Sequence, residues 1–182
     1  MPAPLRPFRL LTLACAAVIL AACGGPRAKP QPLPRFTAPT RHKGEVSAND
    51  ILFRAIALVG TPYRYGGNTP QGGFDCSGLV EYVFRDVAGI VLPRTAQDIS
   101  DIGAPEVRRD RLESGDLVFF RQSSRRVSHV GIYVGEGKFI HSPKPGAQVR
   151  VEDMSGSYWQ RRFSGARRVV STQDDLLKTS GD

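Results

Sequence analysis

The chain has 182 residues, which is enough for one domain of ordinary size with extensions at its ends. A hydrophobic content of 41% and a charged content of 23% are typical of a globular protein with a substantial core, not of a disordered or fibrous chain. The net charge of +8 suits an anionic polymer or membrane headgroups as well as nucleic acid. Because no nucleic-acid motif and no interleaving of basic and aromatic residues is present, we expect no nucleic-acid partner.

The first 22 residues have the pattern of an export signal. Arg6 and Arg9 precede an apolar run from Leu10 to Ala22, which is too short to span a bilayer comfortably. The run leads into Leu20-Ala21-Ala22-Cys23-Gly24, which resembles the lipobox of bacterial lipoproteins. The resemblance implies cleavage before Cys23, lipidation of that cysteine, and an anchor on the periplasmic face of the outer membrane. The alternative is an ordinary secretory signal with an incidental cysteine.

Cysteine usage then singles out one thiol. Cys15 leaves with the signal and Cys23 is alkylated, so Cys76 is the only free thiol expected in the mature protein. A single unpaired cysteine in an oxidising compartment favours a reactive role over a disulfide.

The mature chain is expected to have a tether, one folded domain and a polar tail. Residues 24–43 are rich in proline and poor in apolar residues, which favours an extended tether. We therefore divide the chain into a signal peptide (1–22), a lipidated cysteine with its tether (23–45), a catalytic domain (46–171) and a tail (172–182). His42 lies in the tether and receives no role.

The domain is predicted to open with a helix from Ala48 to Val59. Ser47 and Asp50 resemble a capping box, and Gly60 is a natural stop. One apolar face is predicted, made of Ile51, Leu52, Ala55, Ile56 and Val59.

A second helix is predicted to start at Cys76. Two glycines end a loop, Asp75 takes the N-cap position, and apolar residues follow the cysteine at helical spacing until Gly89. A thiol at a helix start faces free N–H groups and the positive end of the helix dipole, which favour the nucleophilic thiolate. The alternative is a buried structural cysteine.

The remaining expected elements are shorter. They are a helical stretch from about residue 96 to Ile102, strands at Leu117–Phe120, Val149–Glu152 and Gly165–Val170, and an exposed loop at Arg121–Ser128. Trp159 is expected to pack in the core.

The stretch from Ser128 to Ser142 reads as a β-hairpin around a three-residue turn, Gly135-Glu136-Gly137. In that register His129 and His141 point to one face as diagonal neighbours, and Gly131 leaves room for their rings. A two-residue turn would instead place the histidines on opposite faces. The alternative is two unrelated histidines in a sheet.

Cys76, His129 and His141 together have the residue types of nucleophile, base and orienting group. We expect His129 to take the thiol proton in a thiolate–imidazolium pair, and His141 to fix its tautomer. The Cys76 N–H and the Tyr63 hydroxyl are candidate oxyanion donors. A Cys-His-His zinc site is the competing use of the three residues, but short ligand spacing is lacking, so we expect neither a metal nor another cofactor.

Motifs along residues 50–170 resemble those of the NlpC-type peptidases, which are papain-like bacterial cell-wall hydrolases. The segments that carry the resemblance are Tyr63-Arg64-Tyr65-Gly66-Gly67, Asp75-Cys76-Ser77-Gly78-Leu79-Val80, Leu92-Pro93-Arg94-Thr95, Gly115-Asp116-Leu117, His129-Val130-Gly131-Ile132-Tyr133, His141, Tyr158-Trp159, Arg162-Phe163 and Gly165-Ala166-Arg167-Arg168.

The resemblance implies an α+β fold, a circularly permuted papain-like fold with the cysteine helix packed on an antiparallel sheet. It also implies cleavage of peptidoglycan stem peptides next to γ-D-glutamyl or diaminopimelate residues. By matched position Cys76 is the nucleophile, His129 the base, His141 the third polar residue, and Tyr63 lies near the oxyanion. Asp75 and Ser77 match positions that bind the substrate peptide, while Arg94 and Thr95 line the cleft. Ala96 departs from the family pattern, since many relatives have a hydroxyl there, and the loop between Gly67 and Asp75 varies in length across the family. Both leave the peptide preference open.

Three other activities stay open from the sequence. The bond cut could be the amide between N-acetylmuramic acid and L-Ala or a crosslink between two diaminopimelates. The chain could instead be a catalytically silent murein-binding lipoprotein, or an acyltransferase or transamidase on the same scaffold. We expect a monomer, and the sequence identifies no adaptor or regulatory protease.

Overall fold

The computed structural model describes residues 46–122 and 125–170. The predicted signal peptide, lipidation site, tether and polar tail lie outside the described residues. Within the described part, no helix is both long and apolar enough to cross a membrane.

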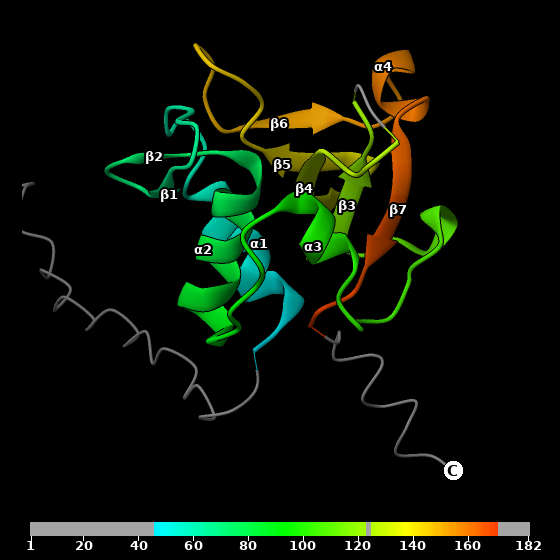
Figure 1. Ribbon diagram of the computed structural model, residues 1–182. Coiled ribbons are helices and arrows are strands. Elements are labelled where there is room, and N and C mark those ends of the chain that lie inside the picture. The colour runs from blue at the N-terminus through cyan, green and yellow to red at the C-terminus, as the bar shows by residue number, and fades with distance from the viewer. Residues whose placement is uncertain (1–45, 123–124, 171–182) are drawn as a thin grey trace, which may run out of the picture. The chain divides into compact units, whose positions relative to one another are not determined.

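The described domain is an α+β structure, as predicted, built on a five-stranded antiparallel sheet with the strand order β6-β5-β4-β3-β7. In Figure 1, α1 and α2 lie together on one side of the sheet, and α4 lies at the far end near β6 and β7. The sheet strands are β3 (Leu117–Phe120), β4 (His129–Gly135), β5 (Lys138–His141), β6 (Arg150–Asp153) and β7 (Phe163–Arg167), and a separate pair is formed by β1 (Asn68–Thr69) and β2 (Gly73–Phe74). The helices are α1 (Ala48–Ile56), α2 (Cys76–Ala88), α3 (Ala96–Ser100), α4 (Ser157–Gln160) and a 3₁₀ turn at Arg109–Arg111.

Helix α1 begins as predicted and ends earlier. Ser47 Oγ accepts a hydrogen bond from the Asp50 N–H, and the Asp50 carboxylate accepts one from the Ser47 N–H, which completes the capping box. After Ile56 the Leu58 and Val59 N–H groups bond three residues back instead of four. This tighter turn directs Leu58 into the core, so the predicted apolar face was wrong at Ile56 and Val59, which are 48% and 45% exposed.

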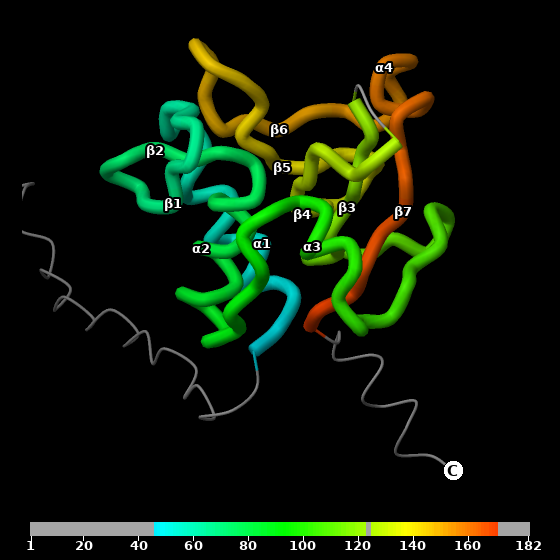
Figure 2. Tube along the Cα trace, viewed as in Figure 1, coloured from blue at the N-terminus to red at the C-terminus, as the bar shows by residue number. Residues whose placement is uncertain are grey.

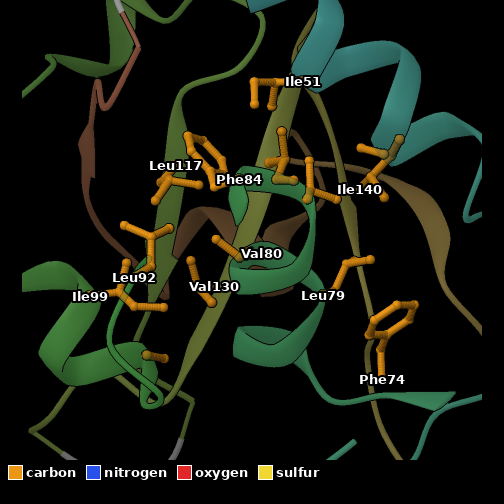
Figure 3. Packing of buried hydrophobic residues seen from close by; sticks show 14 of the residues in the cluster. Ile51, Phe74, Leu79, Val80, Phe84, Leu92, Ile99, Leu117, Val130 and Ile140 are labelled. Atoms are coloured by element: carbon orange, nitrogen blue, oxygen red, sulfur yellow. The ribbon is translucent and has the colours of Figure 1, made fainter. Parts of the chain in front are cut away.

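Helix α2 carries most of the main core. Its apolar side packs between α1 and the sheet, where α2 contacts β4 directly (Figure 3). The helix ends at Gly89, whose left-handed φ of 67° closes the C-terminus as the sequence predicted. The packed residues labelled in the figure are Leu79, Val80 and Phe84 from the helix, with Ile51, Phe74, Leu92, Ile99, Leu117, Val130 and Ile140 around them.

A second, smaller core lies on the opposite face of the sheet. Helix α4 covers this face through Trp159, which is buried, as predicted, against Phe120 and Phe139. Both faces of the sheet are therefore buried where β3, β4 and β5 meet, and polar side chains on these strands need partners within the fold.

The β4–β5 hairpin has the predicted register but a different turn. The turn itself has two residues, Glu136 and Gly137, both with left-handed φ. An irregularity between Tyr133 and Gly135 adds one unpaired residue, so Gly135 pairs with Lys138 while Ile132 pairs with Ile140. The bulge therefore restores the register in which Gly131 lies opposite His141, and both histidines stay on one face.

Two expectations for this part of the sheet were wrong in detail. Gly131 makes room for Phe139, since a Cβ there would lie 2.5 Å from the Phe139 ring. The last strand pairs as Phe163–Arg167, ahead of the predicted Gly165–Val170, because β7 aligns with β3 through a bulge after Phe119.

The loop between β5 and β6 returns to the start of the domain. Figure 2 shows the segment after β5 rising beside the β1–β2 segment. The Tyr63 N–H donates to the Ala147 carbonyl at 2.9 Å, and Pro62 bridges to Gln148. These contacts place the tyrosine-containing loop against the β5–β6 loop, just before β6.

Candidate active site

The Cys76 side chain lies at the first position of α2, against strand β4. Asp75 caps the helix by accepting a hydrogen bond from the Gly78 N–H at 2.7 Å. Burial and the nearby Asp75 carboxylate raise the pKa of the Cys76 thiol, although the backbone N–H groups of Val130 and Ser77 act in the opposite direction. The Val130 N–H follows His129 directly in the chain, so the sulfur lies beside the strand residue predicted to be its base.

His129 and His141 form a buried pair on the opposite face of β4 and β5 from the main core. His129 Nε2 lies 2.7 Å from His141 Nδ1, and the two rings are perpendicular. Trp159 stacks against the His129 ring, and Phe139 contacts the His141 ring. The pair is therefore held rigidly by aromatic side chains, and His141 is 0% exposed.

Burial sets the charge of this pair. Burial lowers the pKa of both histidines well below the ordinary imidazole value. The neighbouring His141 ring lowers the pKa of His129 further, and the Arg150 guanidinium lowers the pKa of His141. With the thiol pKa raised and both imidazole pKa values lowered, the resting site favours a neutral thiol beside neutral rings. This differs from the predicted thiolate–imidazolium pair, because the site is more buried than a helix N-terminus alone implied.

A hydrogen bond ties the two halves of the site together. The Ser142 hydroxyl, directly after His141, donates to the carbonyl of Phe74 at 2.6 Å. Phe74 lies two residues before Cys76. The bond therefore fixes the chain entering α2 relative to the chain leaving β5.

Asp75 and Arg94 form a second polar group beside the thiol. Arg94 donates to both Asp75 carboxylate oxygens and also to Ser77 Oγ at 2.8 Å. The Gly66 N–H donates to the Asp75 carboxylate at 2.9 Å. Burial raises the pKa of Asp75, but the Arg94 hydrogen bond and the Gly78 N–H outweigh it, so the pKa lies below the ordinary value.

An open cleft of about 670 Å³ collects most of the predicted residues. It contains Tyr63, whose pKa is raised by burial and by the Cys76 and Asp75 charges. Thr95 also borders the cleft, where its hydroxyl caps α3 by accepting from the Asp98 N–H. The cleft is lined by Tyr63, Tyr65, Gly66, Asp75, Cys76, Ser77, Arg94, Thr95, Ala96, Gln97, Arg126, Val127 and Ser128.

Glu152 is a polar neighbour of the site that the sequence did not reveal. Its Oε2 lies 3.3 Å from His141 Nε2, on the side of the ring away from His129. The sequence assigned Glu152 only to a strand. Its pairing depends on the conformation of the eight-residue loop between β5 and β6. Within residues 46–122 and 125–170, no group of three His, Cys, Asp or Glu side chains has an arrangement that could hold a metal ion.

The fold and the site together define a class of protein. Its members are papain-like α+β domains with a cysteine at the start of a helix and a histidine pair on the adjoining antiparallel sheet. Residues 60–168 match the model of the NlpC/P60 family, and the chain belongs to that family.

Sequence relatives support the same membership. Over 134 residues the chain is 44% identical to "Murein DD-endopeptidase MepH" of Escherichia coli K12, covering 71% of this chain and 49% of the relative. Over 119 residues it is 41% identical to "Gamma-DL-glutamyl hydrolase" of Bacillus subtilis, covering 65% of this chain and 28% of the relative. The chain thus spans about half or less of the length of these relatives.

Solved structures share the fold. An NLP/P60 family protein described as similar to lipoprotein, from Staphylococcus aureus, superposes with a TM-score of 0.60 at 39% identity, over 69% of this chain and 42% of that one. The NlpC/p60 domain of the peptidoglycan hydrolase SagA gives a TM-score of 0.60 at 31% identity, over 68% of this chain and all of that domain (100%).

Proposed function

We propose that this protein is a cysteine peptidase that hydrolyses peptide bonds in peptidoglycan stem peptides or their crosslinks. The observation that carries the proposal is the placement of Cys76 beside strand β4, where His129 and His141 are paired at 2.7 Å. Family relatives named as murein endopeptidases support the substrate class.

The proposed mechanism starts from the neutral thiol. His129 accepts the Cys76 proton as the sulfur attacks the amide carbonyl, so charge separates only during the attack. The Cys76 N–H and the Tyr63 hydroxyl stabilise the oxyanion; such donors are each worth about 3–4 kcal/mol. The His129 imidazolium then protonates the leaving amine, the S–C bond of the acyl-enzyme is cleaved by water, and the thiol is restored.

The proposed substrate contacts divide between two kinds of residue. Both Asp75 oxygens are engaged by Arg94, Gly66 and Gly78, which suits a carboxylate that holds the loop and the arginine in place. The Arg94 side chain is 40% exposed in the cleft, so it offers a cation to a stem-peptide carboxylate. Ser77 and Thr95 supply further polar groups to the lining of the cleft.

The membrane address is proposed from the sequence. A lipidated Cys23 followed by a proline-rich tether would hold the domain at the periplasmic face of the outer membrane as a monomer. Incorporation of an alkyne-labelled fatty acid into the wild-type chain, and its loss in Cys23→Ala, would support this address. Labelling that is equal in both chains would refute it.

Muropeptide digestion tests the enzymatic proposal. Mass spectrometry of products from purified peptidoglycan separates cleavage at a crosslink, within the stem at γ-D-glutamyl, or at the muramoyl–L-Ala amide. Cys76→Ala should abolish every product while the protein keeps its circular dichroism spectrum. Binding without products from the wild-type chain would favour a silent murein-binding protein, and ligated products with an added amine would favour a transamidase.

A further inference from the structure

The buried histidine pair continues into a carboxylate. His141 Nε2 lies 3.3 Å from Glu152 Oε2, and Arg150 donates to that same oxygen through Nε at 2.8 Å and Nη2 at 2.7 Å. His141 is fully buried, whereas the Glu152 side chain is 28% exposed. The row of polar groups therefore runs from His129 at the start of β4 through His141 to the solvent edge of β6.

Proton positions along this row follow from one constraint. Carboxylate Oε2 accepts two N–H bonds from Arg150 and has no proton to give, so His141 must donate to it from Nε2. A neutral His141 with Nε2 protonated has a bare Nδ1, which can only accept. His129 must then donate from Nε2, and its own Nδ1 is left bare.

The opposite pair of tautomers would be unproductive for catalysis. If His141 carried its proton on Nδ1, it would donate to His129 Nε2, and the His129 proton would move to Nδ1. A protonated Nδ1 cannot accept a proton from the thiol. Because burial keeps both rings neutral, the tautomer of His141 decides whether His129 can act as a base.

We propose that Glu152, held by Arg150, is a positioning residue that selects the active tautomer of the His129–His141 pair. The inference rests on the proposed function, since it gives His129 the role of base, but the tautomers themselves can be read without any substrate. Arg150 and Glu152 of β6 lie on the same face of the sheet as the histidines. Arg150 pairs with His141, and Glu152 pairs with Phe139, which is on the same face of β5 as His141. A simple surface ion pair between Arg150 and Glu152 would require no contact with a buried ring nitrogen.

The direct test is ¹⁵N NMR of the full-length chain labelled on histidine. The chain has three histidines, and His42→Gln assigns the one outside the described residues. We expect Nε2 protonated and Nδ1 bare in both His129 and His141. Glu152→Gln is the key variant, since its amide can donate as well as accept and no longer enforces one tautomer. Glu136→Gln is the matched control, because Glu136 is an exposed turn residue that pairs with Lys138 at the surface.

Kinetics supply the second readout. Glu152→Gln should lower kcat by ~10-fold or more, with the ~10²–10⁴-fold that a general base contributes as the upper limit, and should leave KM nearly unchanged. In a His141→Asn background there is no tautomer to select, so adding Glu152→Gln should cause no further loss.

The outcomes separate cleanly. A wild-type spectrum with Nδ1 of His141 protonated would overturn the proposal, and so would a Glu152→Gln chain whose tautomers match those of the wild type. If the tautomers change while kcat does not, the selection is without consequence and the proposal is also wrong. If the wild type releases no muropeptide product, the proposed function fails. The NMR result alone then decides whether Glu152 selects the tautomer of the histidine pair.

Discussion

The Ser142 hydroxyl donates a hydrogen bond to the Phe74 carbonyl at 2.6 Å, and both groups are buried. This bond joins the residue after His141 to the segment that enters the cysteine helix. The two partners are 68 residues apart in the chain. The relative position of the nucleophile and the histidine pair therefore depends on this long-range hydrogen bond as well as on core packing.

Ser142→Ala should lower both stability and activity. The substitution leaves a buried carbonyl without its donor, so we expect a loss of about 1–3 kcal/mol in the free energy of unfolding, measured by urea titration. Activity should fall more than the folded fraction accounts for, because the histidine pair is no longer fixed relative to Cys76.

Ser157→Ala is the control for this variant, since Ser157 is an exposed residue at the start of α4. It should change neither stability nor turnover appreciably. A Ser142→Ala enzyme with wild-type turnover would show that core packing alone sets the geometry.

Cys76 should become reactive toward alkylating agents only at alkaline pH. Burial and Asp75 raise the pKa of the thiol, so its alkylation by iodoacetamide should be slow at pH 6–7 and should increase as pH passes above the ordinary cysteine value of about 8.5. The measurement uses a chain in which Cys15 and Cys23 are replaced by serine, so that a single thiol reacts.

The same chain unfolded in urea provides the reference, because its thiol should titrate near the ordinary value. A folded chain that reacts rapidly at pH 5–6 would contradict the neutral resting state and would favour the thiolate–imidazolium pair instead.

Local sequence signals predicted much of this fold. The capping box at Ser47, the Asp75 cap, the left-handed Gly89 and the apolar spacing of α2 act within a few residues of one another, so they can be recognised without tertiary information. The histidine pair was predictable because the β4–β5 hairpin is also local. The lipidation of Cys23 stays a prediction.

Features that depend on tertiary packing were not predictable. The end of α1 is set by Leu58 turning into the core, and Trp159 of α4 stacks on His129, whose burial lowers its pKa. Glu152 reaches His141 only after the chain has returned from β5 and paired in one register. No spacing in the sequence encodes that register.

Acid should destabilise the protein through the buried histidines before its carboxylates titrate. Folded-state pKa values below the unfolded value of about 6.5 mean that the unfolded chain binds more protons as pH falls. This part of the stability is fully present above pH ~6.5 and is lost progressively below it, by at most about 1.4 kcal/mol per pH unit for each histidine.

Urea titrations at pH 7.5, 6.5 and 5.5 measure this loss. In His141→Asn only one buried histidine remains, so the slope of stability against pH should be about halved. A wild-type stability that is flat across this window would contradict the neutral buried pair.

Gly78 should be intolerant of even a methyl group. A Cβ at this position would lie 2.0 Å from the Gly67 carbonyl oxygen and 3.1 Å from Asp75 Oδ1, so α2 or the loop must move. Alanine has a higher helix propensity than glycine by about 1 kcal/mol, but such overpacking typically costs 1–3 kcal/mol or more. We therefore expect Gly78→Ala to lower the free energy of unfolding and to reduce turnover, since the loop that moves also carries the Gly66 N–H bonded to Asp75.

Gly103→Ala is the matched control for Gly78→Ala. A Cβ at Gly103 would meet nothing within 4 Å, and the backbone there is not left-handed. Reduced entropy of the unfolded chain should make this change neutral or stabilising by about 0.4–1 kcal/mol. Equal urea midpoints for the two variants would mean that the loop yields to a methyl group. The close approach of α2 to Gly67 would then not be what holds Asp75 beside the thiol.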